Sequence, residues 1–246
     1  MKSIAVWTIK GGVGKTSAAV NLAHAAAADG FRTLIWDLDP QGAASFYLRI
    51  PADMDDAVEA ITKRSVDPAK LAQPTEFDNL SMLPADFAFR HLDLALGASK
   101  KPRKRFAAKL AGLADSYDLA LLDCPPSVSL VSETVVKTVD AILVPVIPST
   151  LSMRTLHQVR AFVADHGRGA EVVPFLSMVD RRKRMHNELS LACLADPAFL
   201  TTAIPAASVV EKMGMTRAPV AATLPSQPAA RAFAALWREI RKRIQV

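Results

Sequence analysis

Short runs of apolar residues alternate along the chain with longer segments in which apolar positions recur at helical spacing. The short runs predict buried strands over residues 4–8, 33–37, 80–83, 119–123, 141–146 and 172–178. The longer segments predict helices over residues 17–28, 87–96, 106–114 and 151–165. Because buried strands separated by helices need crossover connections, we predict an α/β fold, a doubly wound and mostly parallel sheet flanked by helices.

Residues 50–75 do not follow this alternation. Pro51, Pro68 and Pro74 divide the segment into short pieces rather than one long helix. The chain contains no internal repeat, no low-complexity linker and no shift in composition. We therefore expect residues 1–246 to form one domain.

Composition and charge narrow the classes of protein. Half of the 246 residues are hydrophobic, which excludes intrinsic disorder, and the formal net charge of +6 favours a polyanionic partner. Cys124 and Cys193 are far apart and outside any CxxC pattern, so neither a disulfide framework nor a zinc site is predicted. The sequence has no signal peptide and no apolar segment long enough to span a bilayer, and we expect a soluble, cytoplasmic protein.

A glycine-rich segment, KGGVGKT at residues 10–16, joins the first predicted strand to the first predicted helix. In such a turn, backbone N–H groups converge on phosphate oxygens, and the helix N-terminus adds positive potential. We expect Lys15 to reach the β- and γ-phosphates and the hydroxyl of Thr16 to bind Mg²⁺. Ile9 and Lys10 occupy the start of the loop, so the leading glycine of the standard pattern is missing.

Lys10 adds a second cation at the mouth of this loop. Because Lys15 already fills the in-line cationic position, Lys10 is available for another task. It could cross to the phosphates of a neighbouring subunit, as an arginine finger supplied in trans does. It could equally be a solvated lysine beside an anion site, and the residues alone leave both interpretations open.

Carboxylates end two of the predicted strands. Asp37 and Asp39 follow the second strand, and Asp123 ends the strand over 119–123. In an open parallel sheet, groups at the carboxyl ends of strands face the ligand crevice. Asp123 fits a Walker B residue that holds Mg²⁺, Asp39 a group that orients the attacking water, and Asp37 a ligand of the loop or the metal shell. A single strand-end aspartate is usually a cap or turn residue, but three beside a phosphate loop are not well explained in that way.

Three segments together resemble the deviant Walker A ATPases of the ParA/MinD superfamily, and ParA in particular. They are KGGVGKT at 10–16, DLDPQG at 37–42 and LLDCPPS at 121–127. The similarity continues through residues 142–146, 177–181, 203–205, 218–220 and 225–230. It covers nearly the whole chain, strongly over residues 1–150 and more loosely beyond them.

This resemblance implies a P-loop NTPase fold that binds ATP and Mg²⁺ and hydrolyses ATP slowly. Lys10 corresponds to the signature lysine that contacts nucleotide across a sandwich dimer, and Lys10, Lys15 and Asp39 are the implied catalytic residues. Thr16, Asp39 and Asp123 are the implied metal site. The implied nucleotide-binding residues are Lys10, Gly11, Gly12, Val13, Gly14, Lys15, Thr16, Ser17 and Pro205.

The resemblance also implies partners: a homodimer with ATP, non-specific DNA, and a ParB-like or other adaptor protein that stimulates hydrolysis. The cargo would be a plasmid, a chromosome or a large protein assembly, and the ATP-bound protein would associate with the nucleoid. Lys10 lies near the start of the sequence, so we expect no N-terminal helix-turn-helix domain.

The sequence departs from the family at the expected DNA contacts: many family members carry arginines just after the Ile-Pro dipeptide, where residues 206–210 here read AASVV. Basic runs elsewhere offer replacements, although a charge run is often only a solvated face. One such run covers residues 100–105. The set we favour is Arg181, Arg182, Lys183, Arg184, Arg217, Arg241 and Lys242.

Three other functions are compatible with the same fold. The weakest is a regulatory module that holds ATP without turnover, and the presence of Asp39 and Lys10 argues against it. A MinD-like ATPase on the membrane surface would use the basic C-terminal helix, whose apolar residues are Phe233, Leu236, Trp237, Ile240 and Ile244. Any helix packed on a sheet shows the same pattern, so membrane binding is the less favoured reading. A metabolic enzyme, such as an amidase-linked synthetase or a nitrogenase-type reductase, is disfavoured by the chain length and by the two scattered cysteines.

Overall fold

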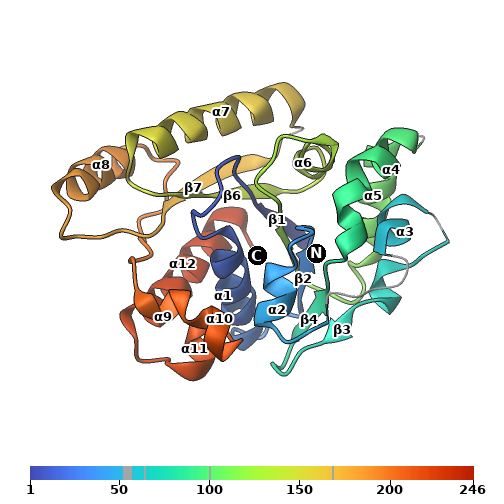
Figure 1. Cartoon of the computed structure of the whole chain (residues 1–246), viewed down its shortest axis with the longest axis horizontal. Helices are drawn as coiled ribbons and strands as arrows, with labels where there is room; N and C mark the ends of the chain where they lie inside the picture. The colour runs from blue at the N-terminus through green and yellow to red at the C-terminus, as the bar shows by residue number, and fades with distance from the viewer. Residues whose placement is uncertain (52–56, 64, 100, 168) are drawn as a thin grey trace.

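Seven strands form a single sheet in the part of the chain that the computed structural model describes, which is residues 1–51, 57–63, 65–99, 101–167 and 169–246. The strand order is β3-β4-β2-β5-β1-β6-β7 (Figure 1). The strands are β1 Lys2–Val6, β2 Thr33–Asp37, β3 Gln73–Pro74, β4 Leu80–Leu83, β5 Leu119–Asp123, β6 Ala141–Val146 and β7 Glu171–Leu176. All pairings are parallel except β3 with β4, so the predicted doubly wound, mostly parallel sheet is confirmed.

Helices cover both faces of the sheet (Figure 1). On one face lie α1 (Lys15–Ala28) and α12 (Pro228–Ile244), which pack against each other. On the other face lie α4 Leu92–Ala98, α5 Pro102–Gly112, α6 Leu130–Val136 and α7 Thr150–His166. The shorter helices are α2 Ala43–Tyr47, α3 Ala57–Thr62, α8 Arg184–Leu194, α9 Ser208–Glu211, α10 Met213–Thr216, α11 Val220–Thr223, and the 3₁₀ turns η1 Pro68–Lys70 and η2 Phe87–His91.

The central strands are buried on both faces because alternate residues point to opposite helical layers. Ile4 and Val6 of β1 pack in the layer of α1 and α12, whereas Ala5 and Trp7 pack in the layer of α4 to α7. This double burial explains why the strands appear in the sequence as continuous apolar runs rather than as alternating patterns.

Several predicted boundaries were wrong. The helix predicted over 87–96 is divided into η2 and α4, and α5 begins at Pro102 rather than at 106. Pro102 suits the first turn of a helix, where its missing N–H is not needed. The short antiparallel strand β3 was not predicted, and it contains Pro74. Within the irregular segment 50–75, residues 52–56 and 64 lie outside the described residues, as does Lys100 of the basic run 100–105.

The topology gathers the ends of the central strands at one edge. β2, β5, β1 and β6 are neighbours, and in register Asp37 of β2 pairs with Asp123 of β5, which pairs with Val6 of β1. The loops that follow these strands therefore meet at the carboxyl edge, where open α/β sheets bind ligands.

Candidate functional site

The loop between β1 and α1 needs glycine at two positions. Gly12 has φ of 69°, and Gly14, the N-cap of α1, has φ of 87° and ψ of 27°. Residues with a side chain rarely adopt this left-handed conformation. A Cβ at Gly14 would also lie 3.2 Å from Oγ of Ser177, whose hydroxyl donates a 2.9 Å hydrogen bond to the carbonyl of Val13. The loop after β7 thus fixes the glycine-rich turn in place.

Lys15 is the first residue of α1, and its side chain is enclosed by the loop. Only 7% of the residue is exposed, and Nζ donates a 3.2 Å hydrogen bond to the carbonyl of Lys10. Burial lowers the pKa of Lys15, and the nearby carboxylates of Asp123 and Asp39 oppose this shift. The glycine-rich turn thus closes around the side chain of Lys15.

Asp123, at the end of β5, is the least satisfied polar group of the site. It is fully buried, and among the described residues neither carboxylate oxygen has a hydrogen-bond partner. Burial and the adjacent Asp37 raise the pKa of Asp123, while Thr16 and Lys15 lie close enough to favour its charged form. An orphaned buried carboxylate is costly and calls for an explanation. A hydrated cation held together with the Thr16 hydroxyl would satisfy it, so these residues fit Mg²⁺.

Mg²⁺ at this site would not need a coordination shell made only of protein ligands. No group of three or more His, Cys, Asp or Glu side chains in the described part of the chain is arranged to hold a metal ion. Mg²⁺ commonly binds through one or two protein ligands and completes its shell with water and substrate phosphates.

Asp37 has a different environment from its neighbour Asp123. Its Oδ2 accepts hydrogen bonds from the N–H (2.9 Å) and the hydroxyl (2.8 Å) of Ser45, and its Oδ1 accepts one from the N–H of Asp39 (3.2 Å). Burial raises the pKa of Asp37 to about 6. With its oxygens engaged in this way, Asp37 anchors α2 and the loop after β2, the first of the two roles considered for it.

Asp39 is half-buried at the mouth of the site. Its Oδ1 accepts a 2.9 Å hydrogen bond from the N–H of Gln41, and its carbonyl accepts one from Gly42. The other carboxylate oxygen makes no hydrogen bond to the described residues. Asp39 is thus held by a local turn with one oxygen left to face a water molecule or a ligand.

Lys10 is hydrogen-bonded within its own chain. Its Nζ donates to Oγ of Ser152 at 3.2 Å, and the hydroxyl of Ser149, the N-cap of α7, donates to the same oxygen at 3.0 Å. In this conformation Lys10 is neither freely solvated nor extended away from the subunit.

A cavity of about 240 Å³ opens beside the phosphate loop. It brings Gly12, Gly14 and Ser17 together with Pro205, which a parallel bridge to Val179 holds next to the end of β7. The cavity is also lined by residues that sequence reasoning missed, namely Tyr47, Ala206, Ala207, Val210, Glu211 and Phe233. They come from α2, α9, α12 and their connecting loops, and no local pattern marks them because only the tertiary fold brings them here.

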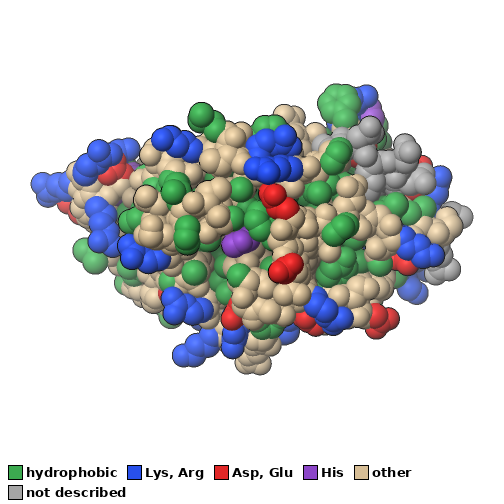
Figure 2. Space-filling view, turned by 90° about the horizontal axis from the view of Figure 1, so that it is seen from below, with side chains coloured by type: hydrophobic (Ala, Val, Ile, Leu, Met, Phe, Trp, Pro, Cys, Tyr) green, Lys and Arg blue, Asp and Glu red, His purple; other side chains and the backbone are tan. Residues whose placement is uncertain are grey.

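The predicted DNA contacts do not form one group. Residues 181–184 follow β7 at the carboxyl edge, where Arg182 pairs with Asp180 and Arg184 pairs with Glu188. Arg217 donates from Nε to the carbonyl of Phe46 at 3.0 Å. The α8 end of the molecule, on the left in Figures 1 and 2, carries a concentration of Lys and Arg side chains.

Arg241 and Lys242 lie at the opposite edge of the sheet. Arg241 forms a 2.7 Å ion pair with Asp29, which caps the end of α1, whereas the phosphate loop is at the start of α1. Because α12 runs alongside α1, the last turn of α12 lies far from the site. Arg241 and Lys242 therefore lie away from residues 181–184, with which the predicted set of DNA contacts groups them.

The apolar face of α12 belongs to the core. Phe233, Leu236, Trp237, Ile240 and Ile244 are all buried, and they pack in the α1 layer. These are the residues that a membrane-surface helix would have to expose. No helix in the described ranges is long and apolar enough to cross a membrane.

Comparison with known proteins agrees with this architecture. A family model described as an AAA domain matches residues 1–168. Chromosome partitioning protein ParA of Caulobacter vibrioides is 31% identical over 200 residues, which cover 77% of this chain and 74% of that protein. Sporulation initiation inhibitor protein Soj of Bacillus subtilis is 34% identical over 146 residues, which cover 59% of this chain and 58% of Soj.

Solved structures share the fold at lower identity. The McdA–ATP complex from Cyanothece superposes with a TM-score of 0.83 at 19% identity, covering 98% of this chain and 96% of that one. Cobyrinic acid a,c-diamide synthase from Mycobacterium smegmatis, solved with ADP and magnesium, has a TM-score of 0.80 at 21% identity, covering 99% and 95%. McdA and a diamide synthase thus share one scaffold, so the fold alone does not decide between functions. The sequence relatives and the family model do decide the family: the chain belongs to the ParA/MinD family of P-loop ATPases.

Proposed function

We propose that this chain is an ATP hydrolase that dimerises with ATP, binds DNA non-specifically and positions a cargo such as a plasmid, a chromosome or a large protein assembly. The observation that carries the proposal is Asp123, a fully buried carboxylate next to the Thr16 hydroxyl and the glycine-rich loop, for which the described residues supply no hydrogen bond within ordinary geometry. The relatives named as chromosome partitioning proteins support the cellular role.

Each residue of the site has a role in this proposal. Residues 11–16 bind the phosphates of ATP, and Thr16 and Asp123 hold Mg²⁺ directly or through water. Bound Mg²⁺ supplies charge neutralisation at the phosphates. Asp39 orients the attacking water with its free oxygen, and the cavity beside Pro205 takes the base. Lys10 leaves Ser152 and neutralises phosphate charge in the second subunit.

DNA binding would use the carboxyl edge of the sheet rather than the whole basic surface. Residues 181–184 and Arg217 lie on the side of the nucleotide cavity, and Arg241 and Lys242 do not. A dimer presents two such patches at once, and the summed phosphate contacts give avidity that a monomer lacks. A ParB-like or other adaptor would stimulate hydrolysis and return the protein to the weakly binding monomer. Before hydrolysis, the ATP-bound protein would be in the cytoplasm and associated with the nucleoid.

The test is binding to a non-specific DNA duplex without nucleotide, with ADP and with ATP·Mg²⁺, each at two salt concentrations. The proposal predicts binding with ATP·Mg²⁺ alone, weakening steeply as salt rises. Binding that is equal in the three nucleotide states would contradict a nucleotide-controlled DNA surface.

A further inference from the structure

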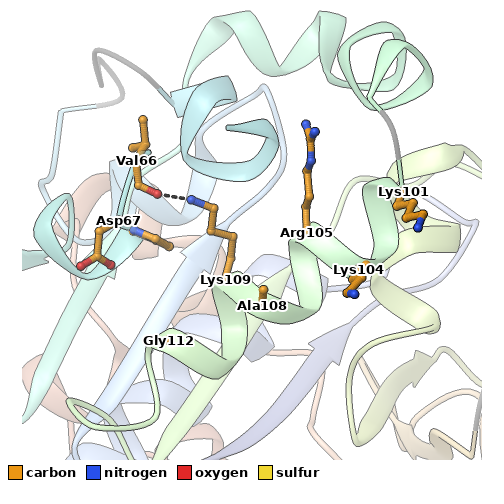
Figure 3. A pocket seen from close by; sticks show the side chains of 9 residues that line it. Val66, Asp67, Lys101, Lys104, Arg105, Ala108, Lys109 and Gly112 are labelled. Carbon is orange, nitrogen blue, oxygen red and sulfur yellow. Dashed lines mark hydrogen bonds between the residues drawn. The ribbon is translucent and has the colours of Figure 1, made fainter. Parts of the chain in front are cut away.

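A second cavity, of about 470 Å³, lies between α5 and the segment around η1 (Figure 3). Lys101, Lys104, Arg105 and Lys109 line it from α5 and its N-cap, and Val66 and Asp67 line it from the other side. We call it the α5 groove. It shares no lining residue with the cavity beside the phosphate loop.

The helix that carries these cations is held rigidly by the core. Phe106, on the inner side of α5, is buried and stacks on Trp36 of β2 with ring centroids 5.3 Å apart. The groove residues are spaced three or four apart, so they form one stripe along the helix, which runs beside Phe106. The positive stripe is therefore presented in a fixed orientation.

Four cationic side chains and one carboxylate, that of Asp67, line the groove. No carboxylate in the described part of the chain lies within ion-pair distance of Lys101 or Lys104, and the Oδ1 of Asp67 already accepts a hydrogen bond from the N–H of Ala69. By contrast, Arg182, Arg184, Arg241 and Arg243 are all paired with carboxylates.

The floor of the groove is narrow and polar. Lys109 is only 8% exposed, and its Nζ reaches across from α5 to donate to the carbonyl of Val66 (Figure 3). Ala108 and Gly112 leave room beside it, because a Cβ added at Gly112 would meet no atom within 4 Å. A main chain can approach the helix closely at such small residues.

We propose that the α5 groove binds an acidic peptide segment of a partner protein. The stripe from Lys101 to Gly112 is about 16 Å long at the helical rise per residue, which about five extended residues would span. An extended peptide can place alternate carboxylates on the lysines and reach the floor at Lys109. A rigid DNA duplex can contact the rim at Lys101 and Lys104 but cannot enter between the helix and Val66.

The probe is a fluorescein-labelled ten-residue peptide of alternating Glu and Ser, titrated by anisotropy with nucleotide-free full chain; the matching Lys–Ser peptide is the charge control. We expect the acidic peptide to bind and the basic one not to bind. Lys104→Glu should raise the dissociation constant about fivefold, the scale of one ion pair. Ala108→Leu should also weaken binding, because it fills the groove without changing charge. Lys242→Glu, an equal charge change on the exposed end of α12, should have no effect.

Equal weakening by Lys104→Glu and Lys242→Glu would overturn the proposal, because attraction to net charge would then explain the binding. It would also be overturned if Lys104→Glu reduced binding of a 20-base-pair duplex and left peptide binding unchanged. Thermal unfolding of each variant verifies folding, and Lys101→Glu replaces Lys104→Glu if the latter unfolds early. These measurements use no nucleotide and do not depend on the proposed ATPase function, so each proposal can fail without the other.

Discussion

The ammonium group of Lys10 is bound by the hydroxyl of Ser152 on α7 of its own subunit, at 3.2 Å. A lysine that must contact the phosphates of a second subunit has to break this hydrogen bond first. In the proposed function, the contact would therefore favour the monomer, and ATP would have to overcome it for the dimer to form.

Ser152→Ala is expected to strengthen ATP-dependent dimerisation by about 30-fold, since each of the two subunits breaks one such hydrogen bond and each bond contributes about 1 kcal/mol. Sedimentation velocity over a range of protein concentrations measures the change. Thr155→Ala is the matched control, because Thr155 lies one turn further along α7 and bonds only to the carbonyl of Leu151. An unchanged dimerisation constant in Ser152→Ala would show that the contact does not restrain Lys10.

Asp39 is expected to act in hydrolysis rather than in nucleotide binding. Asp39→Asn keeps an oxygen that can accept the hydrogen bond from Gln41 but removes the charge, and Asp39→Ala removes both. Both variants should lower kcat by about 100-fold or more and leave a long-lived ATP-bound dimer. Phosphate release and dimer lifetime measure the two effects. If Asp39→Asn hydrolysed ATP at the wild-type rate, Asp39 would be a turn residue only.

The buried Asp37 predicts a particular pH dependence of stability without nucleotide. Burial raises its pKa to about 6 from an unfolded value of 3.8, so the folded state binds more protons between these values. Stability is therefore expected to fall as pH rises from about 4 to about 6, by about 3 kcal/mol at 1.36 kcal/mol per pH unit.

Other groups must be separated from this effect. Asp123 lies next to Asp37, and burial and Asp37 raise its pKa, so it contributes in the same direction and its titration changes when Asp37 is replaced. The pKa of His24 is lowered by burial, which contributes in the opposite direction. Arg32 and Arg182 hold the pKa values of Asp118 and Asp180 at about 2, below the window. The measurement is thus the difference in urea unfolding free energy between wild type and Asp37→Asn across pH 4 to 7. A difference that stays constant over this range would contradict the assignment.

Arg181 and Lys242 separate the two edges of the sheet as DNA surfaces. Arg181 is exposed beside the end of β7, and Lys242 is exposed at the far end of α12. Arg181→Ala should reduce the slope of log affinity against log salt by about 2 in an ATP-bound dimer, at about 0.9 for each phosphate contact. Lys242→Ala should leave the slope unchanged. Anisotropy with a labelled duplex measures both, and the reverse result would move the DNA surface to the opposite edge.

The sequence predicted four strands with the bounds that the structure has, whereas β1 covers Lys2–Val6 rather than residues 4–8. The strands β2, β4, β5 and β6 have the predicted bounds, because strands buried on both faces are apolar throughout. The start of α5 was missed since its first turn, Pro102 to Arg105, is basic and contributes nothing apolar until Phe106. The spacing of apolar residues does not predict the start of a helix whose first turn makes no apolar contact with the core.

The site was predictable as far as its residues are close in sequence. The glycine-rich loop is formed as the motif predicted, and the strand-end carboxylates lie beside it. Asp37 accepts hydrogen bonds from Ser45, whereas Asp123 accepts none within ordinary geometry from the described residues. This difference arises from packing, and the spacing of the two residues in the sequence does not predict it. Likewise, Arg241 and residues 181–184 are equally basic in sequence, and only the path of α12 along α1 separates them.

The most direct measurement is the sedimentation of wild type and Lys10→Ala without nucleotide, with ADP and with ATP·Mg²⁺, alongside their ATP affinities. The account predicts that wild type forms a dimer with ATP·Mg²⁺ alone, and that Lys10→Ala binds ATP but stays monomeric in every state. A Lys10→Ala protein that dimerises with ATP as wild type does would contradict the crossing of Lys10 between subunits. If the wild-type protein had the same association state without nucleotide, with ADP and with ATP·Mg²⁺, the ATP-controlled switch itself would be contradicted.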